Sequence, residues 1–256
     1  MRDIHALDWL RELLLDMDDI GRPIIGIHDW DDAVCTEFKG KLLISSDGPY
    51  EKRLVMKSAL IHAATDILAK GGRPLFALDN LGGRESDITE MATSLRKQAE
   101  FMKIPILGGN TKYWDREPSA SITVVGELLL EEPIRDSTAK SGDVIALFGK
   151  RLWGEQKERL EVARAMFSAW YDVLNEINTT RLCIDACKDV TKGGIKATVE
   201  EIAEKSGLTY NIDCDDEHLT RNLDNLLIAV DENRLDIIRK IAEKHNCPVK
   251  TIGLFE

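Results

Sequence analysis

The chain has 256 residues, of which 43% are hydrophobic and 31% are charged, and its formal net charge is −11. This composition is typical of one large or two ordinary folded domains, and it excludes a disordered chain. The acidic charge argues against a general nucleic-acid partner, because a phosphate backbone would be repelled. No apolar run reaches the roughly 20 residues that span a bilayer.

Residues 1–20 predict an amphipathic helix that lacks the basic start and the apolar centre of a signal peptide. The cysteines form neither a C-x-x-C pair nor a disulfide framework, so we expect a protein of the reducing cytoplasm. Cys183 and Cys187 have the spacing of half a zinc site, but no second half is apparent, which favours buried thiols. The full set is Cys35, Cys183, Cys187, Cys214 and Cys247.

The first half of the chain alternates apolar strands with helices. The stretch SALIHAATDILAKGGRP, residues 58–74, has apolar residues at helical spacing, and its paired glycines and its proline end the helix. A further helix is predicted over residues 85–103. The predicted strands of this half cover residues 24–38, 41–47, 74–82, 104–114 and 119–132.

A linker over residues 133–143 precedes a second half in which the alternation begins again. Residues 181–194 are expected to be irregular and rich in turns. The predicted helices cover residues 155–177, 195–207 and 232–246, and the predicted strands cover 144–149, 208–214, 225–231 and 249–256. We therefore expect an α+β protein of two domains, residues 1–136 and 137–256.

Short acidic or amide side chains stand where apolar elements of the first half end. Asp47 ends the segment LLISSD, Asp66 lies beside the apolar stripe of its helix, and Asn110 follows a glycine pair. Ends of elements tend to meet at a common edge, where several segments build one site. Carboxylates gathered there would repel one another unless a hard cation such as Mg²⁺ were bound. The predicted metal ligands are Asp31, Asp32, Asp47, Asp66 and Asn110.

Each of these residues also has a plain structural interpretation. The pair Asp31 and Asp32 is, taken alone, an ordinary loop pair, and Asp47 is a good turn residue before a Gly-Pro sequence. Asp66 can reach solvent from the edge of its apolar stripe. The set as a whole indicates a site more strongly than any of its members.

The segment KDVTKGGI in the second half combines Asp189, Lys192 and the pair Gly193–Gly194 just before a predicted helix. Bare backbone N–H groups, a helix N-terminus and a lysine together favour a phosphate site. The alternative is an ordinary helix start in which glycine serves the turn. The chain has no P-loop, no G-x-G-x-x-G and no H-E-x-x-H sequence.

Seven segments, taken in order, resemble the two-domain ATP-binding superfamily of aminoimidazole ribonucleotide (AIR) synthetase. They are DDAV, LLISSD, KSALIHAATDILAKGGRP, PILGGNTK, SITVVGEL, GDVIAL and DVTKGGI with EEIAEKSG. The superfamily includes thiamine-monophosphate kinase, selenophosphate synthetase, formylglycinamidine ribonucleotide synthetase and the hydrogenase maturation factor HypE. The resemblance runs from about residue 24 to residue 256, and it is closest to AIR-synthase-related and selenophosphate-synthetase-related proteins, including those of methanogenic archaea.

The resemblance implies a homodimer in which N-terminal sheets pair across the interface, with a C-terminal α/β domain. It implies that the four aspartates of the metal set line one site for Mg²⁺ and ATP, and that Asp189 and the glycines after it meet substrate or phosphate. Asn110 stands where thiamine-monophosphate kinase and HypE have an acid, and its amide oxygen can still ligate magnesium. The implied ATP- or phosphate-binding residues are Asp31, Asp32, Lys57, Gly108, Gly109, Asn110, Asp189, Lys192, Gly193 and Gly194, with Lys112 as a further lysine that could meet phosphate.

The chain also departs from its resemblance. It lacks the reactive Cys or selenocysteine of selenophosphate synthetase and the terminal cysteine of HypE, and the short FGKRLWGE replaces a longer glycine-rich loop. We therefore expect phosphoryl transfer from ATP, dependent on magnesium, to an unidentified small molecule, or ATP-dependent activation of it, with chemistry like that of thiamine-monophosphate kinase. The alternatives are a non-catalytic nucleotide-binding regulatory dimer and a metal-binding structural protein.

Overall fold

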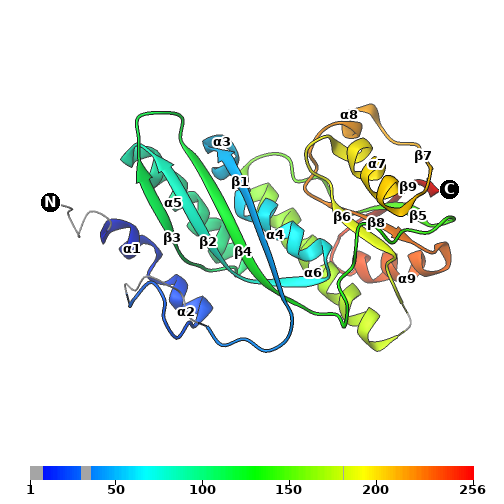
Figure 1. Ribbon diagram of the computed structural model, residues 1–256, viewed down its shortest axis with the longest axis horizontal. Coiled ribbons are helices and arrows are strands. Elements are labelled where there is room, and N and C mark those ends of the chain that lie inside the picture. Colours follow the sequence, from blue (N-terminus) through cyan, green and yellow to red (C-terminus); the bar gives the residue numbers. More distant parts are fainter. Residues whose placement is uncertain (1–7, 30–35, 181) are drawn as a thin grey trace. The chain divides into compact units, whose positions relative to one another are not determined.

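The computed structural model describes residues 8–29, 36–180 and 182–256 (Figure 1). The chain divides into two compact units, residues 1–64 with 74–127 and residues 65–73 with 128–256. Each unit has its own β-sheet and its own helices, so the predicted α+β class with two domains is confirmed. The division after residue 136 stays a prediction.

The first unit contains a four-stranded sheet in the order β1-β4-β2-β3. β1 is antiparallel to β4, and β2 is parallel to β3. The strands are β1 (Leu42–Glu51), β2 (Gly72–Gly83), β3 (Ile106–Tyr113) and β4 (Ser119–Leu128). The helices are α1 (Asp8–Leu14), α2 (Met17–Gly21), α3 (Lys52–Val55), α4 (Ala59–Ala69) and α5 (Glu85–Met102). The end of α4 and the start of β2 belong to the second unit.

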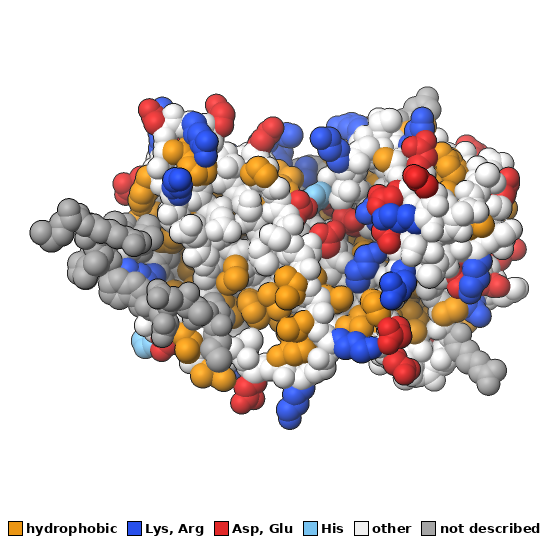
Figure 2. Space-filling view, in the orientation of Figure 1, with side chains coloured by type: hydrophobic (Ala, Val, Ile, Leu, Met, Phe, Trp, Pro, Cys, Tyr) orange, Lys and Arg blue, Asp and Glu red, His pale blue; other side chains and the backbone are white. Residues whose placement is uncertain are grey.

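The two faces of this sheet differ in burial. Ala120, Ile122 and Val124 of β4 are buried, whereas the residues between them are partly exposed. On that partly exposed face, Leu42 and Ile44 of β1 are 47% and 65% exposed. In the space-filling view, hydrophobic side chains gather over the lower ends of β1 and β4 (Figure 2). One face therefore forms the core of this unit, and the other leaves apolar side chains at the surface.

Helix α4 has very little exposed surface, because its alanine, leucine and isoleucine side chains are all at most 2% exposed. The buried side-chain amide of Gln98 on α5 forms hydrogen bonds with the backbone at the start of α4 and just before it. The Leu60 N–H donates to Gln98 Oε1 over 3.1 Å, and Gln98 Nε2 donates to the Val55 carbonyl over 2.8 Å. Gln98 thus satisfies a backbone N–H at the start of α4, and it shares the carbonyl at the end of α3 with Ser94 Oγ, which donates to it over 3.1 Å.

The second unit contains a five-stranded antiparallel sheet in the order β6-β8-β5-β9-β7. The two central strands, β5 (Val144–Phe148) and β8 (Leu226–Val230), are buried along their whole length. The other strands are β6 (Ala186–Asp189), β7 (Tyr210–Ile212) and β9 (Val249–Phe255). The helices are α6 (Gln156–Thr179), α7 (Gly194–Ser206), α8 (Asp216–Leu219) and α9 (Glu232–Glu243). No described helix is long and apolar enough to cross a membrane.

Three predicted elements differ in the structure. The helix expected over 1–20 is divided into α1 and α2 within its described part, and the irregular segment 181–194 contains β6. The strand expected over 24–38 is wrong within its described residues, which hold a single bridge residue at Ile25 followed by a turn. Side-chain carboxylates take the backbone donors there: Asp18 accepts from the Ile27 and His28 N–H groups at 3.0 and 2.7 Å.

Trp170 of α6 anchors the core of the second unit. Its side chain is fully buried, its ring meets the Phe148 ring edge-on at 4.9 Å, and its Nε1 donates to the Leu68 carbonyl over 2.8 Å. The indole therefore fills volume and satisfies one of the last carbonyls of α4 at the same time.

Replacing Trp170 by Phe should lower the free energy of unfolding by about 2 kcal/mol, because the change leaves a cavity and removes one of the two hydrogen bonds to the Leu68 carbonyl, which still accepts from the Gly71 N–H. Urea unfolding followed by circular dichroism measures this. The control is Trp114→Phe, which removes the exposed hydrogen bond from Trp114 Nε1 to the Glu117 carbonyl at 3.2 Å. Equal losses in the two variants would show that the buried bond has no special weight.

Candidate functional site

Asp47 is the predicted ligand that the structure describes most fully. Its Oδ1 accepts from the Gly48 N–H over 2.7 Å, and its Oδ2 lies 3.4 Å from Nε2 of His62 on α4. The His62 side chain is 10% exposed, and the Tyr50 ring lies edge-on to it at 5.5 Å. Asp47 does not end β1 as expected: the strand continues through an irregularity to Glu51. The carboxylate is thus held by a backbone amide and faces a buried imidazole, with 37% of its side chain exposed.

Asp66 follows His62 by one turn of α4, so the two side chains leave the same face of that helix. It is only partly buried, in contrast with the fully buried residues around it. Asp31 and Asp32 lie outside the described residues. Among the residues that the structure does describe, no three His, Cys, Asp or Glu side chains are grouped as a metal site.

Asn110 comes from the other edge of the same sheet. It is exposed in the middle of β3 rather than at a strand end, and it pairs with Asn80 of β2. Because β1 and β3 are the two edge strands, three inter-strand gaps, or roughly 14 Å, separate them laterally. The described unit therefore does not bring Asn110 to Asp47, and the strand order that decides this could not be derived from the sequence.

Asp79 of β2 is a buried acid that the sequence interpretation missed. Its side chain lies beside Gly109 in the β2–β3 register, the residue is 3% exposed, and Oδ2 has no hydrogen-bond partner among the described residues. Burial raises the pKa of this carboxyl to about 7. Gly109 has φ of +158°, and a Cβ there would lie 1.9 Å from the Asp79 carbonyl oxygen. An acid inside the apolar segment PLFALDNLG was the signal for it.

In the second unit, KDVTKGGI forms the end of β6 and the start of α7. Asp189 is 4% exposed, and the N–H of the next residue, Val190, donates to the Asn225 carbonyl over 2.8 Å. Gly193 and Gly194 have φ of +95° and +67°, which disfavours residues with a side chain. At Gly194 a Cβ would also lie 2.6 Å from the Leu219 carbonyl oxygen. The two glycines therefore let the backbone turn sharply into the helix against a neighbouring segment.

The three candidate lysines lie on different elements. Lys57 is half-buried between α3 and α4, Lys112 is exposed on β3, and Lys192 is exposed directly before the α7 glycines. Lys192 is thus the lysine that adjoins a helix N-terminus, the position at which an anion is favoured.

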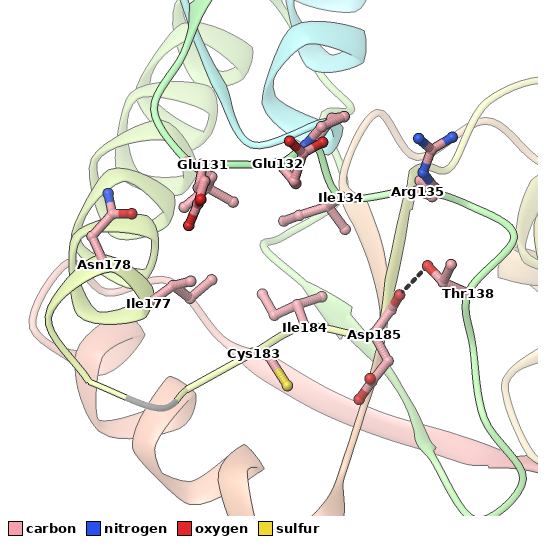
Figure 3. A pocket seen from close by; sticks show the side chains of 12 residues that line it. Glu131, Glu132, Ile134, Arg135, Thr138, Ile177, Asn178, Cys183, Ile184 and Asp185 are labelled. Atoms are coloured by element: carbon pink, nitrogen blue, oxygen red, sulfur yellow. Dashed lines mark hydrogen bonds between the residues drawn. The ribbon is translucent and has the colours of Figure 1, made fainter.

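A cavity of about 460 Å³ lies elsewhere in the second unit (Figure 3). Residues 130–135, Thr138, the end of α6 and residues 183–185 line it, and none of these is a predicted site residue. Cys183 lines this cavity and contacts Arg234, whereas burial raises the pKa of the Cys187 thiol to about 12. The interpretation as buried thiols thus fits Cys187 fully and Cys183 in part.

Comparison with known families gives two matches in chain order. Residues 30–128 match the N-terminal domain of AIR synthase related protein, and residues 137–256 match its C-terminal domain. The chain belongs to the AIR synthase related family. The resemblance inferred from the seven segments is therefore confirmed.

Individual relatives and structures agree with this membership. The uncharacterised protein MJ0799 of Methanocaldococcus jannaschii is 35% identical over 238 residues, covering 89% of this chain and 76% of its own. Selenide, water dikinase of Caldanaerobacter subterraneus is 27% identical over 218 residues, and the match covers 75% of this chain but 61% of the dikinase.

Two solved structures share the fold. Hydrogenase maturation protein HypE in complex with ATP has a TM-score of 0.75 at 18% identity, covering all of this chain and 87% of HypE. Thiamine-monophosphate kinase from Stenotrophomonas maltophilia has a TM-score of 0.72 at 18% identity, covering all of this chain and 94% of the kinase. The two-domain fold that the resemblance implied is thereby confirmed.

Replacing Asp79 by Asn should change the free energy of unfolding, relative to the parent protein, more favourably at pH 8 than at pH 5. The raised pKa means that the folded protein holds the proton more tightly, so this group's contribution to stability is complete below about pH 4 and is lost as pH rises through 7. Between pH 5 and pH 8, the difference in unfolding free energy between variant and parent should change by a few kcal/mol at most, since each pKa unit corresponds to about 1.4 kcal/mol. Unfolding curves at the two pH values measure it.

The control for this test is Asp115→Asn, since the Asp115 side chain is 82% exposed. Its effect should be the same at both pH values. If the effect of Asp79→Asn on the unfolding free energy were also the same at pH 5 and pH 8, the Asp79 carboxyl would not be protonated in the folded protein at pH 5.

Proposed function

We propose that this protein binds ATP with Mg²⁺ and transfers a phosphoryl group from ATP to a small molecule, either as the product or as an activated intermediate. The observation that carries the proposal is the match of both family domains, in order, over residues 30–128 and 137–256. The shared fold with HypE in complex with ATP, which spans this entire chain, supports a nucleotide as the ligand. The proposed chemistry resembles that of thiamine-monophosphate kinase.

The donor set fits magnesium, because it offers carboxylate oxygens and no thiolate. Asp31, Asp32, Asp47 and Asp66 would hold the ion, and the predicted ligand Asn110 is left out of this set because it lies on the opposite edge strand from Asp47. Asp47 is suited to this role, since its carboxylate is fixed by the Gly48 N–H and is still more than one-third exposed. When bound, Mg²⁺ would neutralise charge on the ATP phosphates and hold them for transfer.

The protein's own groups would position the reactants. His62, buried beside the Asp47 carboxylate, would keep that carboxylate oriented. The N–H groups at the start of α7 and the Lys192 ammonium would donate to phosphate oxygens, whereas the buried Asp189 at the same turn would accept from a donor group of the substrate. Because Asn110 lies on the opposite edge strand from Asp47, we assign Gly108, Gly109 and Asn110 to a separate contact with the nucleotide.

We also propose that the exposed face of the first sheet forms a homodimer interface. Leu42 and Ile44 project from this face, and the neighbouring Val125, which pairs with Ile44, adds to the apolar surface. Apolar side chains in such a cluster mark interaction sites more often than scattered ones do.

The second candidate function is a nucleotide-binding dimer without catalysis. Two observations favour it: an amide, Asn110, replaces an acid and lies away from Asp47, and the loop after β5 is short. Steady release of ADP in the presence of any acceptor would contradict this alternative.

Mg-ATP should raise the thermal unfolding midpoint, whereas ATP with a chelator should raise it much less. A ligand at about 100 times its Kd adds roughly 2.7 kcal/mol to the native state. Asp66→Asn should reduce the shift, because it removes a metal ligand. The control is Asp236→Asn on α9, whose side chain is 76% exposed and pairs with Arg239. An undiminished shift and turnover in Asp66→Asn would refute the metal assignment.

Replacing Ile44 by Lys should convert a dimer into a monomer, since a buried unpaired charge costs several kcal/mol. Light scattering after gel filtration measures the mass. Ile237→Lys is the matched control, because Ile237 is an exposed isoleucine of the second unit, at 43%. A monomeric parent protein, or dissociation by both variants alike, would remove the sheet face from consideration.

A further inference from the structure

Five side chains of the second unit form a cluster of basic and aromatic groups that the sequence interpretation did not include. They are Arg151, Trp153, Glu217, His218 and Arg221, and we call them the arginine–tryptophan cluster. Two hydrogen bonds join the two segments that carry it: the Leu152 N–H donates to the Leu223 carbonyl over 2.8 Å, and Trp153 Nε1 donates to the Asn222 carbonyl over 2.7 Å. The cluster therefore rests on a fixed frame.

Both guanidinium groups lie against one indole ring. The Cζ atoms of Arg151 and Arg221 are each 4.2 Å from the centre of the Trp153 ring, and the His218 ring lies 5.7 Å from it. Close cation–π pairs occur about once in 70–80 residues, so two on one ring are a concentrated arrangement. Stacking holds a guanidinium plane in place and leaves its N–H edge available to an oxyanion.

The two arginines share a single carboxylate. Arg221 Nη1 donates to Glu217 Oε1 over 3.3 Å, and Arg151 Nη1 lies 3.5 Å from Glu217 Oε2. Each oxygen of Glu217 thus faces a different arginine, although the Glu217 side chain is 55% exposed. Glu217 occupies the position in which two guanidinium groups would hold an external oxyanion.

His218 contacts one of the two guanidinium groups. Arg151 Nη1 lies 2.8 Å from His218 Nε2, and because arginine can only donate, Nε2 must accept. The ring proton then lies on Nδ1, which is 3.5 Å from Asp215 Oδ2. The imidazole therefore fixes the direction of the Arg151 guanidinium.

The cluster adjoins the start of α7. A Cβ at Gly194 would lie 2.7 Å from the Arg221 backbone nitrogen, so the segment that carries Arg221 passes directly over the α7 glycines. Lys192 precedes those glycines, and the first-turn N–H groups of the helix favour negative charge. In a chain with a net charge of −11, two arginines share Glu217 here, and Lys192 lies two residues before the glycine that the Arg221 segment covers.

We propose that the arginine–tryptophan cluster binds a phosphate group of the acceptor substrate, and that Glu217 holds the place of this group until the ligand displaces it. The proposal rests on the proposed function for the existence of an acceptor. Two guanidinium edges, Lys192 and a helix start offer more donors than a carboxylate can use, and they suit the three terminal oxygens of a phosphate monoester. Because Glu217 competes for the same donors, its removal strengthens binding.

The test is a titration of ¹⁵N-labelled protein with inorganic phosphate at constant ionic strength, without ATP or magnesium. The Trp153 indole N–H resonance, assigned with Trp153→Phe, reports binding. Phosphate should shift it saturably, and Arg151→Gln and Arg221→Gln should each weaken the apparent Kd by about tenfold or more. Arg221→Lys should restore little, because it keeps the charge but loses the fork, whereas Glu217→Gln should tighten binding several-fold.

Lys157→Gln and Glu204→Gln are the controls, since both replace exposed charges of the same unit outside the cluster. They should leave the apparent Kd unchanged. An absent or unsaturable shift, equal effects in the controls, or unchanged affinity in Glu217→Gln would overturn the proposal, and acetate binding as tightly as phosphate would overturn the choice of phosphate. A lost Mg-ATP shift with intact phosphate binding would instead refute the proposed function alone.

Discussion

The burial of helix α4 is the constraint on which two of the predicted metal ligands, Asp47 and Asp66, depend. Its apolar side chains are all but inaccessible to solvent, so each polar residue on the helix needs a partner or a route to the surface. His62 meets this requirement by facing Asp47 on β1, and Asp66, one turn later, stays partly exposed. The carboxylate beside an apolar stripe is therefore explained by its position on the helix: α4 is buried for packing, and Asp66 leaves the same face as His62, which faces Asp47 of β1.

Local chemistry made a large part of this fold predictable. Helical spacing with a glycine stop located α4, and the apolar runs located β5 and β8 closely, because these signals act within a few residues. The strand expected over 24–38 failed because Asp18, some ten residues earlier in the chain, supplies acceptors that replace a strand partner. The strand β6 was missed because four residues, ACKD, carry no strand pattern, and its pairing with β8 defines it.

The candidate site was predictable as a set of residues but not as a geometry. Asp47 and Asn110 both follow apolar runs, yet strand order places them on opposite edges of one sheet, and no local pattern encodes that order. The burial of Asp79 could not be predicted for the same reason, because it depends on a neighbouring strand. Its segment looked like an ordinary strand, but the close approach of Gly109 buries its carboxyl and leaves one oxygen unsatisfied. Glycine at 109 is thus required by the neighbouring strand, in addition to any role toward a ligand.

Two groups of candidates offer opposite chemistry to a ligand. The predicted metal ligands are carboxylates and an amide, which suit a cation, whereas the arginine–tryptophan cluster, Lys192 and the start of α7 supply guanidinium groups, an ammonium and N–H groups, which suit oxyanions. A strongly acidic chain needs such a local concentration of positive charge if it is to hold a phosphate without the metal. Glu217 then has a physical reason to sit between two arginines: it lowers the repulsion between them while the site is empty, and it makes binding depend on a ligand that is a stronger acceptor than a single exposed carboxylate.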